Sequence, residues 1–408
     1  MKKSAFFAVI AFIAVGCTTE KQQLLMQEVQ DKPVAAELTK KGESNVLKGP
    51  SVFQLDDHFV WGASPIKGED NRYYIVYSAF EQGKHPFTTA WVTGSKLGLA
   101  VSDKPDRDFE PLGFFYNTDG YAEDQHRWDA QSVQNPHLRK FGDKYYLYYV
   151  GTVDPGTKQV KSTENTLDRR NRIQQVQKIG VIEFNSFKQL LAGDFKEGNL
   201  LLEARTRVKS DNIVAPSAEG VKALPDNVIV VNPSVVYRPA DGKYLLYFKG
   251  NIYDPSWRGV HGVALGDSPT GPFVAQDFEV FSLKSVDGKK LSAEDPYVWY
   301  NKTDKLFYAV FKDFTGHFTK SGPSLAWMKS KDGIVWDLPK HSLFQKREVT
   351  LLSGEVLKVD RLERPQLLLD DEGNPQVLFA ACSVDNVNPK SDGSSFNIHI
   401  PLRIKYGK

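Results

Sequence analysis

Short apolar segments separated by turn residues follow one another along most of the chain, and one pattern among them occurs five times. Each copy starts with a small or polar residue and a proline, continues into an apolar strand, and is followed by a turn and an aromatic-rich second strand. The five starting pairs are Ser64-Pro65, Asn135-Pro136, Asn232-Pro233, Asp295-Pro296 and Arg364-Pro365. Apolar strands joined by turns such as Gly142-Asp143 and Asp241-Gly242 are typical of antiparallel hairpins.

The spacing of the repeats predicts the fold class. The five prolines are 71, 97, 63 and 69 residues apart, and segments of this length hold a four-stranded antiparallel sheet with its loops. Such units repeated radially form a propeller. The sequence therefore predicts an all-β fold, a five-bladed β-propeller over residues 51–408. Helical periodicity is nearly confined to residues 183–191.

Two further expectations follow for the propeller. Proline cannot donate to a sheet ladder, so it suits a strand start or an edge, and we expect the five prolines to begin the innermost strands. The residues before them would then converge on the central axis. An open propeller would leave sheet edges exposed, so we expect the region near Ser51 to pair with the C-terminal strand near residues 397–404.

Two segments interrupt the repeats: residues 157–177, which are charged, and residues 210–227, which include Pro216 and Pro225. Their composition favours solvated loops, and a wall beside the axial site is the alternative.

The first residues resemble the signal of a bacterial lipoprotein. Lys2 and Lys3 precede an apolar run from Ala5 to Val15, and Gly16-Cys17 closes it. About ten apolar residues are too few to span a bilayer as a stable helix but fit a signal peptide. We expect residues 1–16 to be a signal peptide and residues 17–50 a flexible tether. An ordinary secretory signal with a chance cysteine is the alternative.

This signal also predicts where the protein acts. Acylation of Cys17 would place an exported, membrane-anchored protein in the periplasm, at the outer membrane or at the cell surface. Cys382 is the only other cysteine and cannot form an internal disulfide with a lipidated partner. It stands in an apolar run, so we expect a packed thiol. The net charge of +2, with acidic and basic residues interspersed, gives no indication of nucleic-acid binding.

Several acidic, polar and aromatic residues stand close to the five repeat starts. Carboxyl groups crowded together raise the pKa of at least one of them. A protonated and an ionised carboxyl across a sugar bond are what glycoside hydrolysis needs, and tryptophans can stack on sugar faces. The candidates are Asp57, Trp61, Trp128, Asp129, His137, Asn232, Glu294, Asp295, Glu363 and Arg364. No spacing resembles a zinc site, so we expect no cofactor; a structural divalent cation in the central channel is the alternative.

Two motifs make the chain resemble a known group of proteins. The first is Asn-Pro-Ser-Val-Val-Tyr at 232–237 with Asp-Gly-Lys-Tyr-Leu-Leu-Tyr at 241–247, and the second is Gly-Val-Ala at 262–264 with Ser-Pro-Thr-Gly-Pro-Phe at 268–273. They are similar to the third blade of the five-bladed propeller glycoside hydrolases of family 43 and the related family 117. The resemblance covers residues 51 to 405.

This resemblance implies roles for particular positions. Family 43 has its general acid, a Glu, two residues before the fourth proline, and Glu294 occupies that place. It has the base directly before the first proline and an acid-tuning Asp directly before the third, where this chain has Ser64 and Asn232. We therefore expect Asp57, eight residues before Pro65, to replace the base.

The remaining candidates receive supporting roles. Asp129 is expected to tune or position the acid, and Glu363 to bind sugar hydroxyls. The other expected substrate-binding residues are Asp295, Trp61, Trp128, Asn232, Arg364 and His137.

These observations predict an exo-acting glycoside hydrolase that releases terminal sugars from polysaccharide-derived oligosaccharides. Family 117 implies algal galactan fragments and family 43 implies arabinose or xylose. The first alternative is a catalytically inactive carbohydrate-binding propeller, which the Ser64 and Asn232 departures favour. A propeller scaffold for protein contacts is the second, but it would not need acidic residues at the strand starts.

Overall fold

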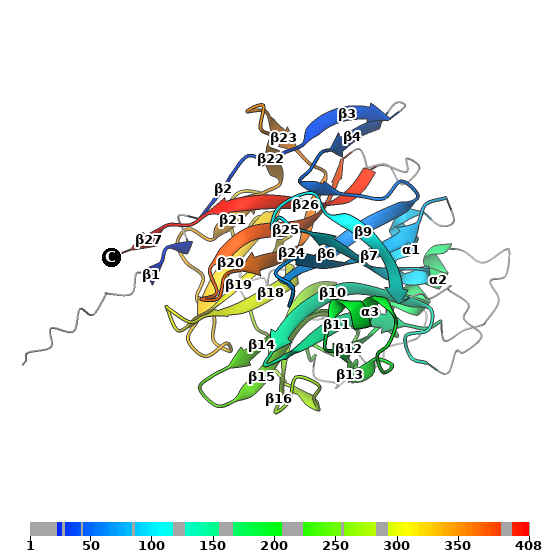
Figure 1. Cartoon of the computed structure of the whole chain (residues 1–408). Helices are drawn as coiled ribbons and strands as arrows, with labels where there is room; N and C mark the ends of the chain where they lie inside the picture. Colours follow the sequence, from blue (N-terminus) through cyan, green and yellow to red (C-terminus); the bar gives the residue numbers. More distant parts are fainter. Residues whose placement is uncertain are drawn as a thin grey trace, which may run out of the picture.

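Each of the five sequence repeats forms one antiparallel sheet, and the five sheets together make a β-propeller (Figure 1). The prediction of a five-bladed propeller is therefore confirmed. The computed structural model describes residues 23–26, 29–41, 44–83, 86–116, 127–154, 166–205, 223–253, 257–282, 293–384 and 394–407. The predicted signal peptide and Cys17 lie outside these residues, as do residues 210–222 of the predicted insertion at 210–227.

The first four blades are four-stranded, and in each the strands lie side by side in chain order. Blade 1 contains β6 (His58–Lys67), β7 (Tyr73–Glu81), β8 (Lys96–Ser102) and β9 (Glu110–Tyr116). Blade 2 contains β10 (Ser132–Phe141), β11 (Lys144–Thr152), β12 (Lys178–Phe184) and β13 (Asn199–Glu203). Blade 3 contains β14 (Val230–Arg238), β15 (Lys243–Tyr253), β16 (Trp257–Gly266) and β17 (Phe273–Ala275). Blade 4 contains β18 (Ala293–Asn301), β19 (Leu306–Asp313), β20 (Ser324–Ser330) and β21 (Leu343–Lys346).

Blade 5 closes the ring with strands from both ends of the chain. Its strands are β24 (Arg361–Leu369), β25 (Pro375–Val384) and β26 (Ser394–Arg403), completed by β2 (Gln30–Asp31) and β5 (Val52–Phe53). Val52 lies opposite Ile398, and Phe53 lies opposite Asn397. The predicted closure near Ser51 is confirmed, since the Ser51 carbonyl also accepts a hydrogen bond from the His399 N–H at 2.9 Å.

The prediction of a flexible tether over residues 17–50 is wrong from Gln23 onward. This segment forms β1 (Gln23–Leu24), which pairs with β27 (Tyr406–Gly407), and the hairpin of β3 (Glu37–Lys41) and β4 (Ser44–Lys48). A second hairpin, β22 (Glu348–Thr350) with β23 (Val356–Lys358), lies beside it in Figure 1. Leu24, Val34 and Leu47 are buried in the core beneath blades 4 and 5. A few apolar side chains in a polar segment are enough to anchor it because each burial is favourable.

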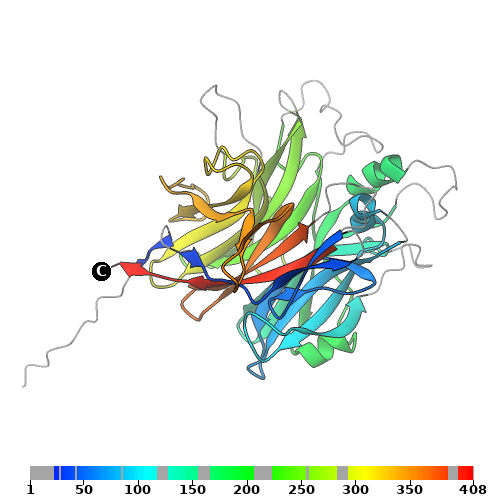
Figure 2. The same cartoon turned by 90° about the horizontal axis from the view of Figure 1, so that it is seen from above.

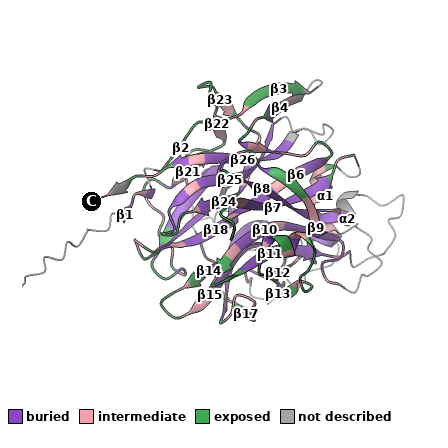
Figure 3. Ribbon diagram, viewed as in Figure 1, coloured by how far each residue is buried: buried purple, intermediate pink, exposed green. Residues whose placement is uncertain are grey.

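The core lies between neighbouring blades. One cluster joins apolar side chains of blades 1 and 2, another those of blades 2 and 3, and the others continue around the ring. The second strand of each blade is almost entirely buried, as the purple ribbons of Figure 3 show. Cys382 belongs to this core and is fully buried, so the expected packed thiol is confirmed. Burial raises the pKa of its thiol well above the ordinary value.

Three short helices interrupt the sheets in the described part of the chain. The helix expected around residues 183–191 is α3 (Phe187–Leu191), which begins after Ser186, whose hydroxyl accepts the Gln189 N–H. The sequence did not reveal α1 (Phe87–Thr93) and α2 (Thr166–Gln174). They contact each other at one edge of the propeller and lie side by side in Figure 2.

The five innermost strands share an irregularity that the prolines only partly mark. In blades 2 to 5 the sheet register shifts across the proline, and the residue before it has a positive φ. In blade 1 the shift falls at Gly62 instead, and Pro65 lies in regular pairing with Ile75. The expectation that each proline begins its strand is therefore wrong: four prolines sit within a β-bulge, where the ladder needs no N–H.

Candidate functional site

The bulges bring equivalent positions of the five blades together around the axis in three levels. The axial ring, as we name the middle level, consists of the positive-φ residues Gly62, Asn135, Asn232, Asp295 and Arg364. The upper level, one residue earlier, consists of Trp61, Gln134, Val231, Glu294 and Glu363. The lower level, two residues after the axial ring, consists of Ser64, His137, Ser234, Tyr297 and Gln366.

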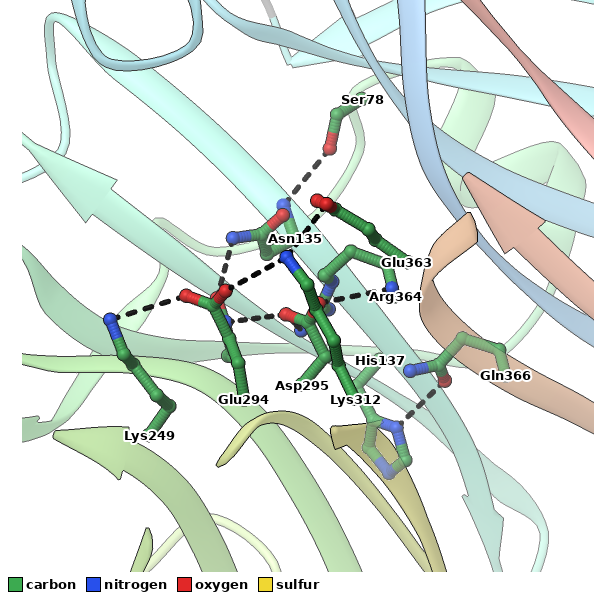
Figure 4. Close-up of polar contacts among 11 residues, drawn as sticks. Ser78, Asn135, His137, Lys249, Glu294, Asp295, Lys312, Glu363, Arg364 and Gln366 are labelled. Atoms are coloured by element: carbon green, nitrogen blue, oxygen red, sulfur yellow. Dashed lines mark hydrogen bonds and ion pairs between the residues drawn. The ribbon is translucent and has the colours of Figure 1, made fainter. Parts of the chain in front are cut away.

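A chain of polar contacts links the axial ring from blade to blade (Figure 4). The amide of Asn135 donates to the Asn232 side-chain oxygen at 2.7 Å, and the Asn232 amide donates to Asp295 Oδ1 at 2.6 Å. The backbone N–H of Arg364 donates to Asp295 Oδ2 at 3.1 Å, and its guanidinium lies 3.5 Å from Oδ1. Arg364 then lies against Gly62, which has no side chain of its own. These contacts close the floor of the site.

The lower level is structural. Ser64 Oγ accepts the Leu138 N–H of the next blade at 2.8 Å, and Ser234 Oγ accepts the Val298 N–H at 2.9 Å. His137 is fully buried and lies 3.0 Å from Gln366 Oε1. Burial lowers the pKa of His137 well below its ordinary value. Its predicted role in substrate binding is wrong because it lies beneath the axial ring.

The same contacts correct the alignment of blade 1. Ser64 and Ser234 make the same bond to the next blade, so Ser64 is equivalent to Ser234 and not to the residue before a proline. The positive-φ position of blade 1 is Gly62, with Ala63 in the place of the proline. The position that the resemblance assigns to a base is therefore Gly62, which also lacks a carboxylate.

The upper level carries two carboxylates, Glu294 and Glu363, and both form ion pairs with lysines. Glu294 lies 3.2 Å from Lys249 Nζ and 3.5 Å from Lys312 Nζ. Lys312 also donates to Glu363 at 2.6 Å, so one ammonium group holds the carboxylates of two neighbouring blades (Figure 4). Both lysines come from second strands, opposite Val231 and Glu294 in the sheet register.

Two adjacent carboxyl groups have pKa values shifted in opposite directions. Burial alone would raise the pKa of Glu294, but Lys249 and Lys312 outweigh it and lower this pKa to about 2. Burial and the nearby Glu294 carboxylate raise the pKa of Asp295 to about 6, against the opposing effects of Arg364 and Lys312. The expectation that neighbouring carboxylates raise the pKa of Glu294 is therefore wrong, and Asp295 is the carboxyl group of the pair that holds its proton to higher pH.

A cavity of about 380 Å³ opens above the axial ring, a size typical of small-molecule sites. It brings together the predicted residues Glu294, Asp295, Glu363, Arg364, Asn232 and Trp61. The sequence missed a wall made by α1 and α2. This wall contributes Phe87, Thr88, Trp91, Arg170, Gln174 and, just after α2, Gln177. The insertion at 157–177 therefore forms a wall of the site where it is described, which was the alternative prediction.

Three other predicted residues lie outside this cavity. Asp57 is an exposed side chain in a separate surface hollow, where it contacts His58 Nδ1 at 2.7 Å. This hydrogen bond lowers the pKa of Asp57. Asp57 is misplaced for a base because it lines this separate hollow and not the cavity above the axial ring.

Asp129 and Trp128 are structural residues of blade 2. Asp129 is buried and accepts hydrogen bonds from the hydroxyls of Tyr116 and Tyr149 at 2.5 and 2.6 Å, with Arg127 at 3.0 Å. Trp128 stacks on Tyr149, and its indole N–H donates to the Gly198 carbonyl. Their predicted roles in tuning and substrate binding are wrong because these contacts hold both side chains within the blade.

Two further findings concern metals and membranes. Within the described parts of the chain, no three His, Cys, Asp or Glu side chains come together in a way that could hold a metal ion. Among the same residues, no helix has the length and apolar character needed to cross a membrane.

Comparison with known proteins identifies the fold. No family model and no curated protein matches the sequence. A solved family 117 glycoside hydrolase from the marine bacterium Zobellia galactanivorans matches with 15% identity and a TM-score of 0.53, over 94% of this chain and 91% of that one. An α-L-arabinofuranosidase from Lactobacillus brevis matches with 10% identity and a TM-score of 0.53, over 86% and 92%. A third structure, described as a glycoside hydrolase, has 10% identity and a TM-score of 0.55, over 88% and 92%. The chain thus has the propeller fold of these proteins.

Proposed function

We propose that the protein is an exo-acting glycoside hydrolase in which Asp295 donates the proton to the leaving oxygen and Glu294 is the ionised partner. The observation that carries this proposal is the pair of neighbouring carboxyl groups in one cavity, with one pKa raised to about 6 and the other lowered to about 2. Environments that push two pKa values apart are how one site provides an acid and a base together. The glycoside hydrolases with the same fold support the reaction class.

These roles differ from those that the family resemblance implies. A general acid must carry a proton at the pH of the reaction. The two lysines favour the ionised form of Glu294, which suits a base or a nucleophile, while Asp295 keeps the proton that an acid needs. Glu363, held by Lys312, faces the same cavity and binds sugar hydroxyls.

The shape of the cavity favours release of terminal sugars. The axial ring closes its floor through the contacts of Asn135, Asn232, Asp295 and Arg364. A chain end can enter such a pocket, whereas an internal segment would need a groove open at both ends. Trp61, Phe87 and Trp91 line the wall and provide faces on which sugar rings stack.

The test is a screen followed by one substitution. The purified protein is incubated with oligosaccharides from agar, carrageenan, arabinan and xylan, and we expect release of one monosaccharide from chain ends. On the substrate found, Glu294→Gln should lower kcat by about 10²-fold or more, whatever the leaving group. Glu183→Gln, which removes a carboxylate from a surface ion pair with Lys144, is the matched control. Near-normal activity of Glu294→Gln would overturn the assignment.

A carbohydrate-binding protein without catalysis is the second candidate. Gly62 and Asn232 favour it, because they stand where the resembling family has two of its three carboxylates. A wild-type protein that binds these oligosaccharides in calorimetry and hydrolyses none of them would establish this function instead.

The proposal includes export and anchoring through a lipid on Cys17, as the first residues predict. Cys17→Ser should move the protein from the membrane fraction to the soluble fraction, because an acyl chain on this residue is the expected anchor. Continued sedimentation with membranes would contradict the lipid anchor and leave the enzymatic proposal untouched.

A further inference from the structure

Among the described residues that line the cavity above the axial ring, cationic side chains outnumber anionic ones. Its three carboxyl groups are Glu294, Asp295 and Glu363, and its cations are Lys249, Lys312, Arg361, Arg364 and Arg170. Four of these cations contact the carboxyl groups at 2.6–3.8 Å. A neutral sugar would leave this positive charge uncompensated.

Arg170 is the cation that has no carboxylate partner among the described residues. Burial lowers the pKa of its guanidinium, and no charge of the described residues opposes this effect. Its Cζ lies 5.8 Å from the centre of the Trp91 ring, and its Nε is buried without a hydrogen-bond partner in the described part of the structure. A half-buried guanidinium kept charged without a counter-ion is costly unless a ligand supplies the negative charge.

Two glutamines beside Arg170 also have unused hydrogen-bonding atoms. Gln174 lies one helical turn after Arg170 on α2, and its Oε1 is buried without a partner in the described residues. Gln177 follows and is almost fully buried, and neither its Oε1 nor its Nε2 has such a partner. All three side chains line the same cavity. The guanidinium of Arg170 and the side-chain NH2 of Gln177 are donors that can bind a carboxylate or a sulfate, and the amide oxygens of the two glutamines are acceptors that suit hydroxyls of the same sugar.

Arg361 also lines the cavity and is an arginine that has an anionic partner. It lies over the ring of Phe87 at 5.6 Å, much as Arg170 lies over Trp91, but its guanidinium is 3.8 Å from Glu363. The two arginines therefore lie over the two aromatic rings of α1, and Arg170 differs from Arg361 in having no carboxylate partner in the described part of the chain.

We infer that Arg170, with Gln174 and Gln177, forms a subsite for an anionic group on the sugar, either a carboxylate or a sulfate ester. This inference rests on the proposed function for the identity of the ligand as an oligosaccharide. The enzyme then acts on anionic oligosaccharides: the charged group binds at α2, the sugar ring packs against Trp91, and the chain end reaches Asp295 and Glu294.

Binding to matched oligosaccharide pairs tests the subsite. One pair is trigalacturonate and its methyl ester, which differ in the carboxylates; the other is a sulfated carrageenan tetrasaccharide and its desulfated form. Calorimetry at low salt should show that the wild type prefers the charged member of one pair by about tenfold or more. The pair that shows the preference distinguishes a carboxylate from a sulfate. The preference should weaken as salt is added.

Substitutions then test whether Arg170 causes the preference for the charged oligosaccharide. Arg170→Gln should reduce the affinity ratio of the pair to near one, and Arg170→Lys should retain part of it because the charge remains. Arg72→Gln, which removes a cation from an exposed ion pair with Asp103 in blade 1, is the matched control and should keep the full ratio. Thermal unfolding of all variants shows whether the fold is intact.

The outcomes separate this inference from the proposed function. Equal binding of both members in both pairs, or a preference that survives Arg170→Gln, overturns the subsite even when hydrolysis is observed. A preference that depends on Arg170 in a protein that hydrolyses nothing upholds the subsite and overturns catalysis.

Discussion

Blades 4 and 1 place different chemistry at equivalent positions of the same backbone. In blade 4 the upper level and the axial ring hold Glu294 and Asp295, and in blade 1 they hold Trp61 and Gly62. Both strands have the bulge and the positive φ, so both aim these positions at the axis. The propeller therefore fixes where side chains meet, and the side chains of each blade decide what they do there.

The largest expected effect comes from removing the acidic side chain of blade 4 from the axial ring, so that blade 4 resembles blade 3, which has Asn232 there. Asp295→Asn keeps the shape of the side chain and removes the proton donor, so kcat on a natural oligosaccharide should fall by about 10² to 10⁴-fold. A substrate with a good leaving group needs less protonation and should be partly spared. Steady-state kinetics on the two substrate types provide the measurement. An equal loss on both would show that Asp295 does not act as the acid.

The pH dependence of activity sharpens the same point. Because Asp295 must hold a proton and its pKa is raised to about 6, kcat/KM should fall about tenfold per unit above about pH 6. Glu294, with a pKa lowered to about 2, stays ionised and gives no acidic limb in the usual range. The Glu363 charge also raises the pKa of Asp295, so Glu363→Gln should move the limb to lower pH. A limb that moves to higher pH, or stays in place, would contradict this coupling.

The sequence contains the repeats but not their alignment around the axis. Local sequence signals predict the number of blades, the closing strands and the inward position of Glu294. These signals are strand runs, turns and the residue spacing before Pro296. In blade 1 the proline is a misleading marker, because Pro65 lies two residues after Ala63, which stands where the other blades have their proline. The bulge at Gly62 has no sequence signal as strong as a proline. Equivalent positions of the five blades can be aligned only when the positions of the bulges in the structure are known.

The sequence also did not predict the charged contacts that lower the pKa of Glu294. Lys249 and Lys312 reach Glu294 from two different blades, a contact between residues far apart along the chain. The helices α1 and α2 are short, so their periodicity is weak, although Phe87 and Trp91 stand one turn apart. The predicted roles of Asp57 and Asp129 depend on their distance from a proline along the chain, and this distance does not determine the direction of a side chain.

The lower level offers a matched comparison of stability between blades 1 and 3. Ser64→Ala removes the acceptor of the buried Leu138 N–H, and Ser234→Ala removes that of the Val298 N–H. An unsatisfied buried donor costs about 1–3 kcal/mol, so both variants should lower the free energy of unfolding by about this amount, and Ser64→Ala by somewhat more because the Ser64 hydroxyl also donates to Gln366 Oε1 at 3.2 Å. Urea denaturation measures the effect, with the exposed Ser353→Ala as control, expected to change it by less than about 0.5 kcal/mol. A smaller loss for Ser64→Ala than for Ser234→Ala would argue against their equivalence.

The smallest expected effect comes from giving blade 1 a side chain at the axial ring. Gly62 has a φ of 60°, and a Cβ there would meet only Arg364, at 3.6 Å or more, which is an ordinary contact. Gly62→Ala therefore carries a backbone cost alone, about 1 kcal/mol. Gly62→Asn should cost less, because Asn tolerates this conformation, as Asn135 and Asn232 show in blades 2 and 3. Its amide oxygen would also face Arg364 Nε, which lacks a hydrogen-bond partner among the described residues. Urea denaturation of both variants decides the matter: an Asn variant less stable than the Ala variant would mean that blade 1 is not built like its neighbours.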